Sequence, residues 1–353
     1  MNAFCLKSPG EVGYCEVEEP KIVPYGAIIK PLAVSPCSSD VHTAFGGGSP
    51  KQPNLVFGHE GIGEIIEIGC NVKDFSVGDF VAIPAITPDW RAVDIQNGNY
   101  NHASGHFSGH QLGNKIPGVF AEKVLIPDAD TTLAKIPDCI SKKQALMSVD
   151  VVTTGFTGAE NANIKIGDTV CVIGIGPIGL MAIAGAKLLG AGRIIAVGTR
   201  PVCVELAKFY GATDVISYKD GDIVAQVLET TNQRGADSVI IAGGNREVFT
   251  QAFDMVCYGI GTVSNINYFS GKGYLDFPIF SGGRGMAGKT LHTSLAKGGR
   301  ARIERIFEMI KYGRLDPSYL VTHELFGFGK IEEGLNMMKD KSSDLIKVMI
   351  NIL

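Results

Sequence analysis

The sequence lacks the features that mark membrane, nucleic-acid-binding and secreted proteins. No apolar run approaches the ~20 residues of a transmembrane helix, which argues against a membrane span. The formal net charge of -4 leaves no basic stripe for nucleic acid and no polybasic membrane anchor. The first residues, Met1 to Lys7, lead into Ser-Pro-Gly and lack the long apolar core of a secretory signal. We therefore expect a cytoplasmic protein that binds neither nucleic acid nor membrane.

The eight cysteines include no C-x-x-C pair. Scattered single cysteines argue against a disulfide framework and against a closed structural zinc site. Seven of them are expected to be small buried hydrophobic residues, and Cys171, inside an apolar run, is the clearest example. Cys37 is the exception, because it lies in a polar string with serines, an aspartate and a histidine.

Glycine, in contrast, is abundant, with 45 residues in a chain of 353, a length that suggests two domains. Up to about Asp150 short apolar runs are broken by Gly, Pro and Asp, which predicts a mainly antiparallel β unit. The predicted strands lie within residues 26–34, 61–69, 78–84 and 118–126.

The polar stretch from Thr87 to Pro117 carries His102, His106 and His110. A spacing of four would align the three histidines as a metal-binding face if the stretch were helical. The interleaved glycines disfavour a helix, so we interpret the stretch as an exposed or pocket-rimming loop.

After Asp150 strands alternate with helices, the pattern of βαβ units in a doubly wound parallel sheet. The predicted strands are 170–173, 193–197, 238–241 and 261–267, and the predicted helices are 177–189 and 201–210. From Ala296 two more helices (302–312 and 330–339) and a final strand (346–350) are expected to return to the first domain. The predicted division is therefore 1–151, 152–295 and a returning segment 296–353.

The tripeptide Gly58-His59-Glu60, together with Cys37, suggests a metal site. Catalytic zinc takes three protein ligands such as thiolate and imidazole and keeps one position open. The alternative is a surface pair or a hydrogen-bonded core histidine. Glycines at 58, 61, 63 and 69 alternate with isoleucines, which indicates extended chain bent where backbone or ligand approaches closely.

A G-x-G-x-x-G motif separates the first strand of the second region from its helix. Such glycines permit a tight turn and close approach of a pyrophosphate to the helix N-terminus. The motif comprises Gly174, Ile175, Gly176, Pro177, Ile178 and Gly179.

The second strand of this region ends in Gly198-Thr199-Arg200, where NAD-binding proteins carry an acidic residue for the ribose 2′-hydroxyl. Without that carboxylate, Thr199 and Arg200 can bind a 2′-phosphate, which predicts NADP(H) rather than NAD(H). The alternative is that Arg200 is a solvated residue at a helix start.

Together, the segments Gly58-His59-Glu60-x-x-Gly63-x5-Gly69-x-x-Val72 and 174–179 resemble the zinc-dependent medium-chain alcohol dehydrogenases over essentially the whole chain. The segments 31–37, 87–91 and 190–195 are similar in detail to the tetrameric NADP-dependent secondary alcohol dehydrogenases. The resemblance implies a GroES-like catalytic domain, a Rossmann domain and a homotetramer.

The resemblance also implies roles for individual residues. The catalytic zinc would be held by Cys37, His59 and Asp150, with Glu60 entering the shell when substrate is absent. Ser39 and His42 would relay the alcohol proton to solvent. The cofactor would meet Thr199, Arg200 and Tyr218 at the 2′-phosphate, Asn265, Ile266 and Asn267 beside the nicotinamide, and Lys341 at a more distant phosphate.

Two departures from the family pattern affect these expectations. The Thr87 to Pro117 region has no cysteine, so one zinc per subunit is expected in place of an additional structural zinc. His110 stands where close relatives place tryptophan in the substrate pocket, which changes the size and polarity of that pocket.

The expected activity is reversible, NADP-dependent oxidation of a small secondary alcohol of the 2-propanol type to a ketone, with short aldehydes as further substrates. A polyol dehydrogenase of the same superfamily and a non-catalytic NADP-binding structural protein are the alternatives. A zinc-free quinone reductase is disfavoured because such relatives lack the Cys37 and His59 pair.

Overall fold

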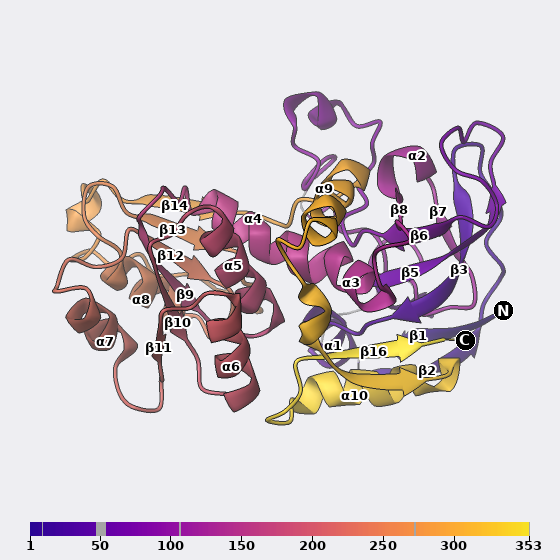
Figure 1. Cartoon of the computed structure of the whole chain (residues 1–353). Coiled ribbons are helices and arrows are strands. Elements are labelled where there is room, and N and C mark those ends of the chain that lie inside the picture. Colours follow the sequence, from indigo (N-terminus) through magenta and orange to yellow (C-terminus); the bar gives the residue numbers. More distant parts are fainter. Residues whose placement is uncertain (9, 47–53, 106, 272, 353) are drawn as a thin grey trace. The chain divides into compact units, whose positions relative to one another are not determined.

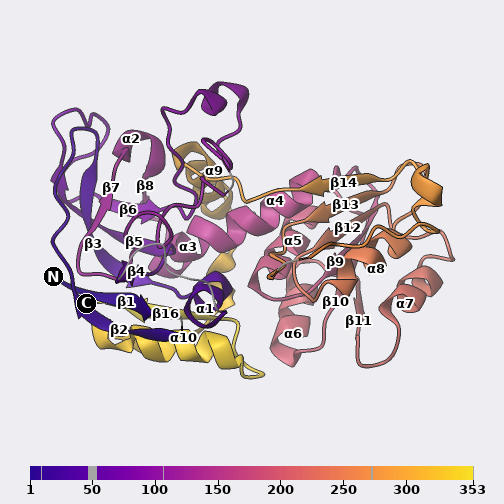
Figure 2. The same cartoon turned by 180° about the vertical axis from the view of Figure 1, so that it is seen from behind.

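The chain forms two compact units (Figures 1 and 2). The computed structural model describes residues 1–8, 10–46, 54–105, 107–271 and 273–352. The first unit comprises Met1–Thr153 and Lys297–Leu353, and the second comprises Thr154–Ala296. The boundaries therefore follow Thr153 and Ala296, whereas the sequence suggested boundaries after residues 151 and 295.

The first unit contains two sheets, which are antiparallel except for the pair β15 and β16. The larger has the strand order β15-β16-β3-β5-β6-β8, with β7 paired to β3. Its strands are β3 (Ala27–Val34), β5 (Gly61–Ile68), β6 (Phe80–Ile83), β7 (Val124–Ile126), β8 (Ala134–Lys135), β15 (Val321–Phe326) and β16 (Lys347–Asn351). The smaller has the order β2-β1-β4, with β1 (Asn2–Ser8), β2 (Glu11–Glu16) and β4 (Leu55–Val56).

The predicted strands 26–34, 61–69 and 78–84 correspond to β3, β5 and β6. The predicted strand 118–126 is shorter in the structure, where only β7 is a regular strand. In the first part of the predicted strand, the backbone N–H groups of Val119 and Phe120 instead donate 2.9 Å hydrogen bonds to the carbonyls of Gly58 and Phe57, respectively. This pairing binds residues 119–120 to the segment that carries His59.

Among the described residues of the first unit, three α-helices lie before residue 153 and two lie in the returning segment. They are α1 (Ser38–Phe45), α2 (Ala129–Thr132), α3 (Lys142–Met147), α9 (Arg300–Lys311) and α10 (Ile331–Asp340), with 3₁₀ turns η1 (Val93–Asn97), η4 (Pro317–Leu320) and η5 (Phe328–Lys330), and a π-helical turn η2 (Ser148–Val152). The predicted helices 302–312 and 330–339 correspond to α9 and α10. Strand β16 pairs with β3, opposing Ile350 to Val34, so the end of the chain completes the larger sheet.

The expectation for the cysteines was partly wrong. Cys5 and Cys15 form a disulfide, with Cα atoms 6.3 Å apart. Their strands are antiparallel, and the register opposes Ala3 to Cys15, which brings both thiols to one face. Spacing along the chain does not reveal that register. Cys70 and Cys139 are exposed rather than buried, whereas Cys171, Cys203 and Cys257 are buried as expected.

The second unit is a parallel sheet with the order β11-β10-β9-β12-β13-β14, the doubly wound arrangement that the sequence predicts. Helices α5 and α6 cover one face, and α7 and α8 cover the other (Figures 1 and 2). The strands are β9 (Thr169–Ile173), β10 (Arg193–Val197), β11 (Asp214–Ile216), β12 (Ser238–Ile241), β13 (Thr262–Asn265) and β14 (Thr290–Thr293). The helices are α4 (Thr153–Asn161), α5 (Pro177–Leu188), α6 (Pro201–Tyr210), α7 (Ile223–Thr230) and α8 (Glu247–Met255), with a 3₁₀ turn η3 (Gly283–Gly285).

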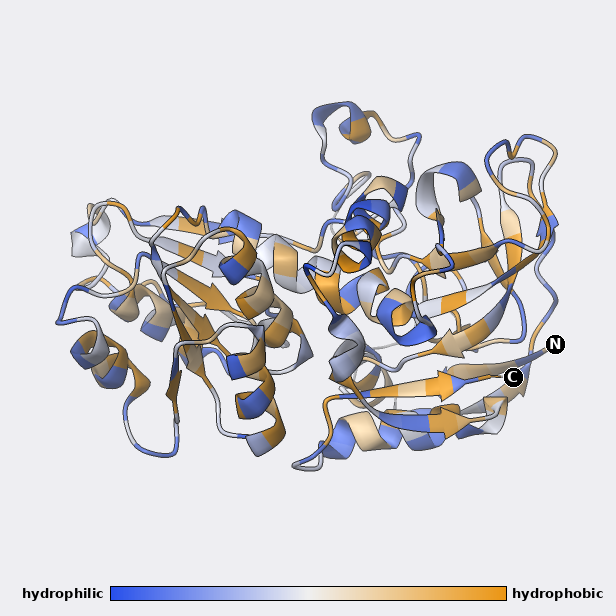
Figure 3. Ribbon diagram, in the orientation of Figure 1, coloured by the Kyte–Doolittle hydropathy of each residue, from blue (hydrophilic) through white to orange (hydrophobic). Residues whose placement is uncertain are grey.

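The central strands of this sheet are apolar because helices cover both faces. Residues Val170 to Ile173 and Val239 to Ile241 are buried, and Figure 3 shows these strands as hydrophobic ribbon between helices with hydrophilic outer faces. Within the described residues, no helix combines the length and apolarity needed to cross a membrane.

Candidate metal and cofactor sites

Four potential metal ligands meet in the first unit. Their ligand atoms, from Cys37, His59, Glu60 and Asp150, all lie within 4.8 Å of one another. The Cys37 Sγ is 3.9 Å from Asp150 Oδ2, and His59 Nε2 is 3.7 Å from the same oxygen. The structure therefore brings together residues that are 113 positions apart in the sequence.

Local backbone geometry directs the first three of these side chains inward. Cys37 is the N-cap residue of α1. Gly58 has φ of +87°, and a Cβ at this position would overlap the ring of Phe120. A residue other than glycine is therefore unfavourable at position 58. The left-handed turn at Gly58 leads into His59 and Glu60, which are 3% and 0% exposed just before β5.

Asp150 lies in the π-helical turn η2, between α3 and α4. Such turns interrupt the regular spacing of helical side chains and occur frequently at functional sites. Val149, Val151 and Val152 are buried, whereas Asp150 is half-buried. The turn thus presents one carboxylate to the cluster from an otherwise apolar segment.

Asp40, which the sequence did not suggest as a site residue, orients His59. Its Oδ1 is 3.3 Å from His59 Nδ1, and its Oδ2 accepts a 2.9 Å hydrogen bond from the backbone N–H of Cys37. Burial by itself would lower the pKa of His59, but Asp40, Asp150 and Cys37 raise it well above its usual value. A carboxylate on Nδ1 leaves Nε2 for a metal, an arrangement common around zinc-binding histidines.

Glu60 forms a buried ion pair with Lys347, which is also a residue that sequence reasoning missed. Lys347 Nζ donates to Glu60 Oε1 at 2.8 Å and lies 2.7 Å from Oε2. Burial raises the pKa of Glu60 to about 7, although Lys347 acts in the opposite direction. The sequence does place a lysine inside the predicted apolar strand 346–350. Because buried lysines are rare without a partner, this lysine could have indicated a buried acidic partner.

His110 contacts His59, one of the four candidate metal ligands. Its ring meets that of His59 edge to face, with ring centroids 4.8 Å apart. Burial and the charge of His59 lower the pKa of His110 to about 4, so its imidazole is neutral at pH 7. Residues 87–117 contain no α-helix among those the structure describes, as expected, and His106 lies outside the described residues.

The predicted relay residues both lie on α1. Ser39 Oγ is 3.3 Å from His59 Nε2, and His42 is exposed one turn further along the helix. Residues three apart on a helix share a face. A hydroxyl beside the cluster is therefore followed by an imidazole at the surface.

The donor set of the cluster suits zinc. Thiolate, imidazole and carboxylate are the usual zinc ligands, and usual bond lengths place tetrahedral ligand atoms about 3.3–3.5 Å apart. The separations of 3.9 and 3.7 Å need only a slight contraction to reach that range. The raised pKa of His59 indicates that the cluster favours positive charge.

The glycine motif of the second unit forms a turn suited to a dinucleotide. Gly174 has φ of +87°, and a Cβ there would approach Gly243, after β12, to 2.8 Å. A Cβ on Gly179 would overlap the Gly174 carbonyl, whereas a Cβ on Gly176 meets nothing within 4 Å. Gly176 is the N-cap of α5, so open space lies at the helix N-terminus where a pyrophosphate binds. Ile175 is buried, and Pro177 and Ile178 begin the helix.

The predicted 2′-phosphate residues lie at the ends of β10 and β11. Thr199 Oγ1 donates a 2.8 Å hydrogen bond to the Tyr218 hydroxyl, and Arg200 is the N-cap of α6. A side chain on Gly198 would overlap Ile175, so the turn after β10 packs closely against the glycine-rich turn after β9. The structure thus brings Thr199 and Tyr218 together at the carboxyl edge of the sheet.

The predicted nicotinamide segment begins at Asn265, the last residue of β13. Asn265 and Asn267 hydrogen-bond to each other, and Asn267 Nδ2 donates to the Gly244 carbonyl at 3.2 Å. Ile266 donates its backbone N–H to Ile241. Lys341 belongs to the first unit, where it ends α10 with φ of +51°.

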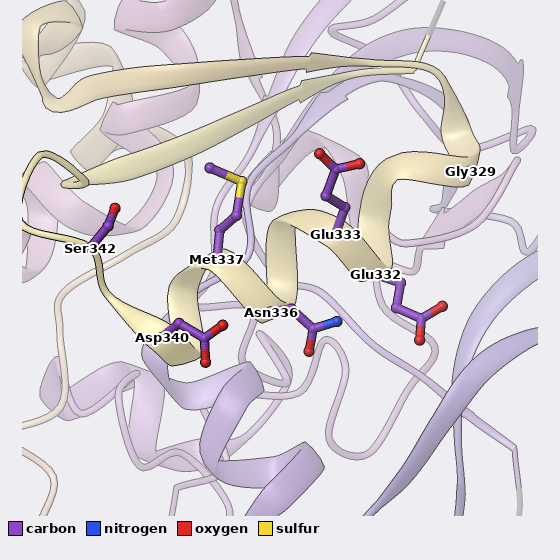
Figure 4. A pocket seen from close by; sticks show the side chains of 7 residues that line it. All are labelled: Gly329, Glu332, Glu333, Asn336, Met337, Asp340 and Ser342. Carbon is purple, nitrogen blue, oxygen red and sulfur yellow. The ribbon is translucent and has the colours of Figure 1, made fainter.

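A separate hollow of about 620 Å³ runs along α10 (Figure 4). Glu332, Asn336 and Asp340 share one face of the helix, while Glu333 and Met337 point to the other side. None of the predicted site residues lines this hollow, and its acidic character is that of an ordinary solvated helix.

Comparison with known proteins identifies the family. Residues 24–138 match the alcohol dehydrogenase GroES-like domain, and residues 177–310 match the zinc-binding dehydrogenase family. The chain is 50% identical over 350 residues to the NADP-dependent isopropanol dehydrogenase of Thermoanaerobacter brockii, with 99% of both chains covered. It is 49% identical over 350 residues to the enzyme of that name from Clostridium beijerinckii, again with 99% of each chain covered.

Comparison with a solved structure supports the same family assignment. The alcohol dehydrogenase TADH from Thermus sp. ATN1 is 28% identical, with a TM-score of 0.87 and 100% of both chains covered. The chain therefore belongs to the zinc-dependent alcohol dehydrogenase family. Within that family it is similar, over nearly its whole length, to the NADP-dependent isopropanol dehydrogenases. The predicted combination of a GroES-like and a Rossmann domain is confirmed.

Proposed function

We propose that this protein is a zinc- and NADP-dependent dehydrogenase that interconverts small secondary alcohols, such as 2-propanol, with ketones, and that also accepts short aldehydes. The observation that carries the proposal is the meeting of Cys37, His59 and Asp150 in a chain half identical to NADP-dependent isopropanol dehydrogenases. One zinc per subunit is part of the proposal.

Cys37, His59 and Asp150 would hold the zinc, and Glu60 would be an exchangeable fourth ligand. Bound zinc would supply Lewis acidity, which polarises an alcohol or carbonyl oxygen. The support for Glu60 being an exchangeable ligand is that Lys347 Nζ donates a hydrogen bond to Oε1, whereas the buried Oε2, 2.7 Å from Nζ, has no hydrogen-bond partner within the described part of the chain. Asp40 holds the His59 ring with Nε2 facing the cluster.

Ser39 and His42 would move the alcohol proton. The Ser39 hydroxyl lies beside the His59 ligand atom, where it is placed to accept a proton from the substrate hydroxyl. His42, exposed on the same helix, would pass that proton to solvent. His110 contributes a neutral imidazole next to His59, so this side of the site is polar where close relatives are expected to have tryptophan.

The second unit would bind NADP(H). The N-terminus of α5, open at Gly176, receives the pyrophosphate, and the Thr199–Tyr218 pair together with Arg200 receives the 2′-phosphate. The bound nicotinamide would supply the hydride acceptor and donor. Asn265, Ile266 and Asn267 would lie beside the ring, and Lys341 would contact a phosphate.

The active form would be a homotetramer in the cytoplasm, the compartment predicted from the sequence. The assembly is supported by β14, an edge strand whose four residues are all exposed. Edge strands that expose apolar residues favour pairing with another chain. Exposed apolar side chains of the same unit include Tyr258, Ile260, Tyr274, Phe277, Ile279, Phe280, Met286 and Leu291.

One assay tests the activity. Oxidation of NADPH should be measured with acetone and with short aldehydes, before and after treatment with a zinc chelator. We expect acetone-dependent oxidation that the chelator abolishes and added zinc restores. Activity with sorbitol-like polyols but not with 2-propanol would favour the polyol dehydrogenase alternative, and the absence of any turnover would refute the proposal.

A pair of variants tests the ligand set. Asp150→Ala should lose bound zinc and activity together, since the carboxylate completes three protein ligands. Asp138→Ala, on an exposed loop of the same unit, is the matched control and should retain both. Retention of zinc and activity by Asp150→Ala would remove Asp150 from the ligand set.

A further inference from the structure

His110 carries a half-buried imidazole for which the proposed metal and proton chemistry has no role. Its ring meets the ring of His59 at 86°, with centroids 4.8 Å apart. The charge of Asp150, a second candidate ligand, also acts on the His110 ring. The imidazole therefore lies among the residues that would hold the metal.

The exposure of the candidate ligands shows from which side a substrate can reach them. His59 and Glu60 are buried, whereas the Asp150 side chain is 13% exposed and Cys37 is half-buried. The four ligands are therefore accessible from the side of Cys37 and Asp150. His110, itself half-buried and acted on by the Asp150 charge, borders that accessible side.

Backbone hydrogen bonds hold His110 in its loop. Its N–H donates to the Phe107 carbonyl at 3.0 Å, and its carbonyl accepts a 3.2 Å hydrogen bond from Asn114 Nδ2. The carbonyl of the preceding Gly109 accepts a 2.7 Å hydrogen bond from the N–H of Thr87. An anchored backbone therefore presents the ring, as a side chain that selects substrates requires.

The imidazole of His110 can bind one further polar partner. Each of the two ring nitrogens of a histidine can form a hydrogen bond, in the neutral and in the protonated ring. One hydrogen bond joins the His110 ring to the Ala85 backbone, which leaves the second nitrogen for a ligand. An apolar ligand would cover that nitrogen without supplying a partner, which is unfavourable, whereas a ligand oxygen there would pair with it.

We propose that His110 is a specificity-determining residue that binds a second oxygen of the substrate, on the carbon next to the one that reacts. The substrates that it favours are small vicinal diols and the corresponding α-hydroxyketones. This inference rests on the proposed function, because it names a substrate class for the same metal site. Simple secondary alcohols remain substrates, since their single oxygen needs only the metal.

The test compares racemic 1,2-propanediol with racemic 2-butanol, which has a methyl group in place of the second hydroxyl group. Their dissociation constants should be measured by calorimetry with the zinc-loaded, full-length protein and NADPH. Because NADPH cannot reduce an alcohol, binding is measured without turnover. The wild type should bind the diol at least as tightly as 2-butanol.

His110→Phe keeps an aromatic ring beside His59 but removes both ring nitrogens. It should weaken binding of the diol about tenfold relative to binding of 2-butanol. The ratio of kcat/KM for the two alcohols, measured as NADPH formation from NADP, should fall likewise. His110→Leu replaces His110→Phe if the phenylalanine variant does not fold.

His323→Phe is the matched control, because it makes the same substitution at another half-buried histidine of the first unit. The His323 ring lies on β15, where Nδ1 is 3.0 Å from the Thr322 hydroxyl. None of the candidate metal ligands belongs to this strand. His323→Phe should leave both ratios unchanged.

Two results overturn the inference. One is weaker binding of the diol than of 2-butanol by the wild type, and the other is an unchanged binding ratio in the folded His110 variant. A wild-type protein that turns over neither 2-propanol nor the diol would instead refute the proposed function, so the two failures are distinguishable.

Discussion

Replacing Asp40 with asparagine should weaken zinc binding about thirtyfold, an effect of about 2 kcal/mol. Asp40 uses one oxygen for His59 Nδ1, at 3.3 Å, and the other for the backbone N–H of Cys37, at 2.9 Å. Asparagine has a single carbonyl oxygen, so one of these two buried donors would face an amide N–H group. A hydrogen bond to a charged partner contributes about 1.5–3 kcal/mol. Mutation of residues that orient metal ligands typically lowers metal affinity about 10- to 100-fold, and the expected thirtyfold loss lies within that range.

The zinc dissociation constant should be measured by competition with a chromogenic chelator, for the wild type and Asp40→Asn. Thermal unfolding at saturating zinc would show that the variant is folded. Asp138→Asn makes the same chemical change on an exposed loop and should stay within about twofold of the wild type. If Asp40→Asn binds zinc within about threefold of the wild type, a difference below about 0.7 kcal/mol, the proposed role of Asp40 is refuted.

Zinc affinity should fall as pH falls, by about tenfold per pH unit for each proton that zinc binding releases, because the raised pKa of His59 keeps its imidazole protonated until the metal displaces the proton. Calorimetry in buffers of different ionisation enthalpy would measure the proton release, and the absence of release would contradict the prediction. Arg200→Ser should raise the KM for NADP by about ten- to hundredfold with little change for NAD, and equal effects on both cofactors would show that Arg200 does not bind the 2′-phosphate. Ser39→Ala should lower kcat by about 10² or more with little effect on KM for 2-propanol, and an unchanged kcat would exclude Ser39 from proton transfer. Leu291→Lys should reduce the proposed tetramer to smaller species in light scattering, whereas Ile166→Lys, also on the surface of the second unit, should leave the assembly unchanged.

Elements that depend on local patterns could be predicted well. Strands β9, β10 and β12 and helices α5 and α6 agree with the predicted bounds to within one residue at each end. Hydrophobic runs and punctuating glycines carry this information over short stretches of chain. Contacts that depend on strand register or on the packing of a loop could not be read in the same way. The Cys5–Cys15 disulfide depends on the register of two strands, and the burial of His110 depends on how a loop packs.

The sequence by itself determined the two-part architecture, the dinucleotide turn and the pairing of Cys37 with His59, because each is encoded by residues that are neighbours or follow a recognisable family pattern. Only the tertiary structure decided which other charged groups surround these two residues. Lys347 and Glu60 are separated by 287 positions, and their contact exists because β16 returns to pair with β3. Side chains this far apart meet through sheet topology and register, which local sequence patterns do not specify.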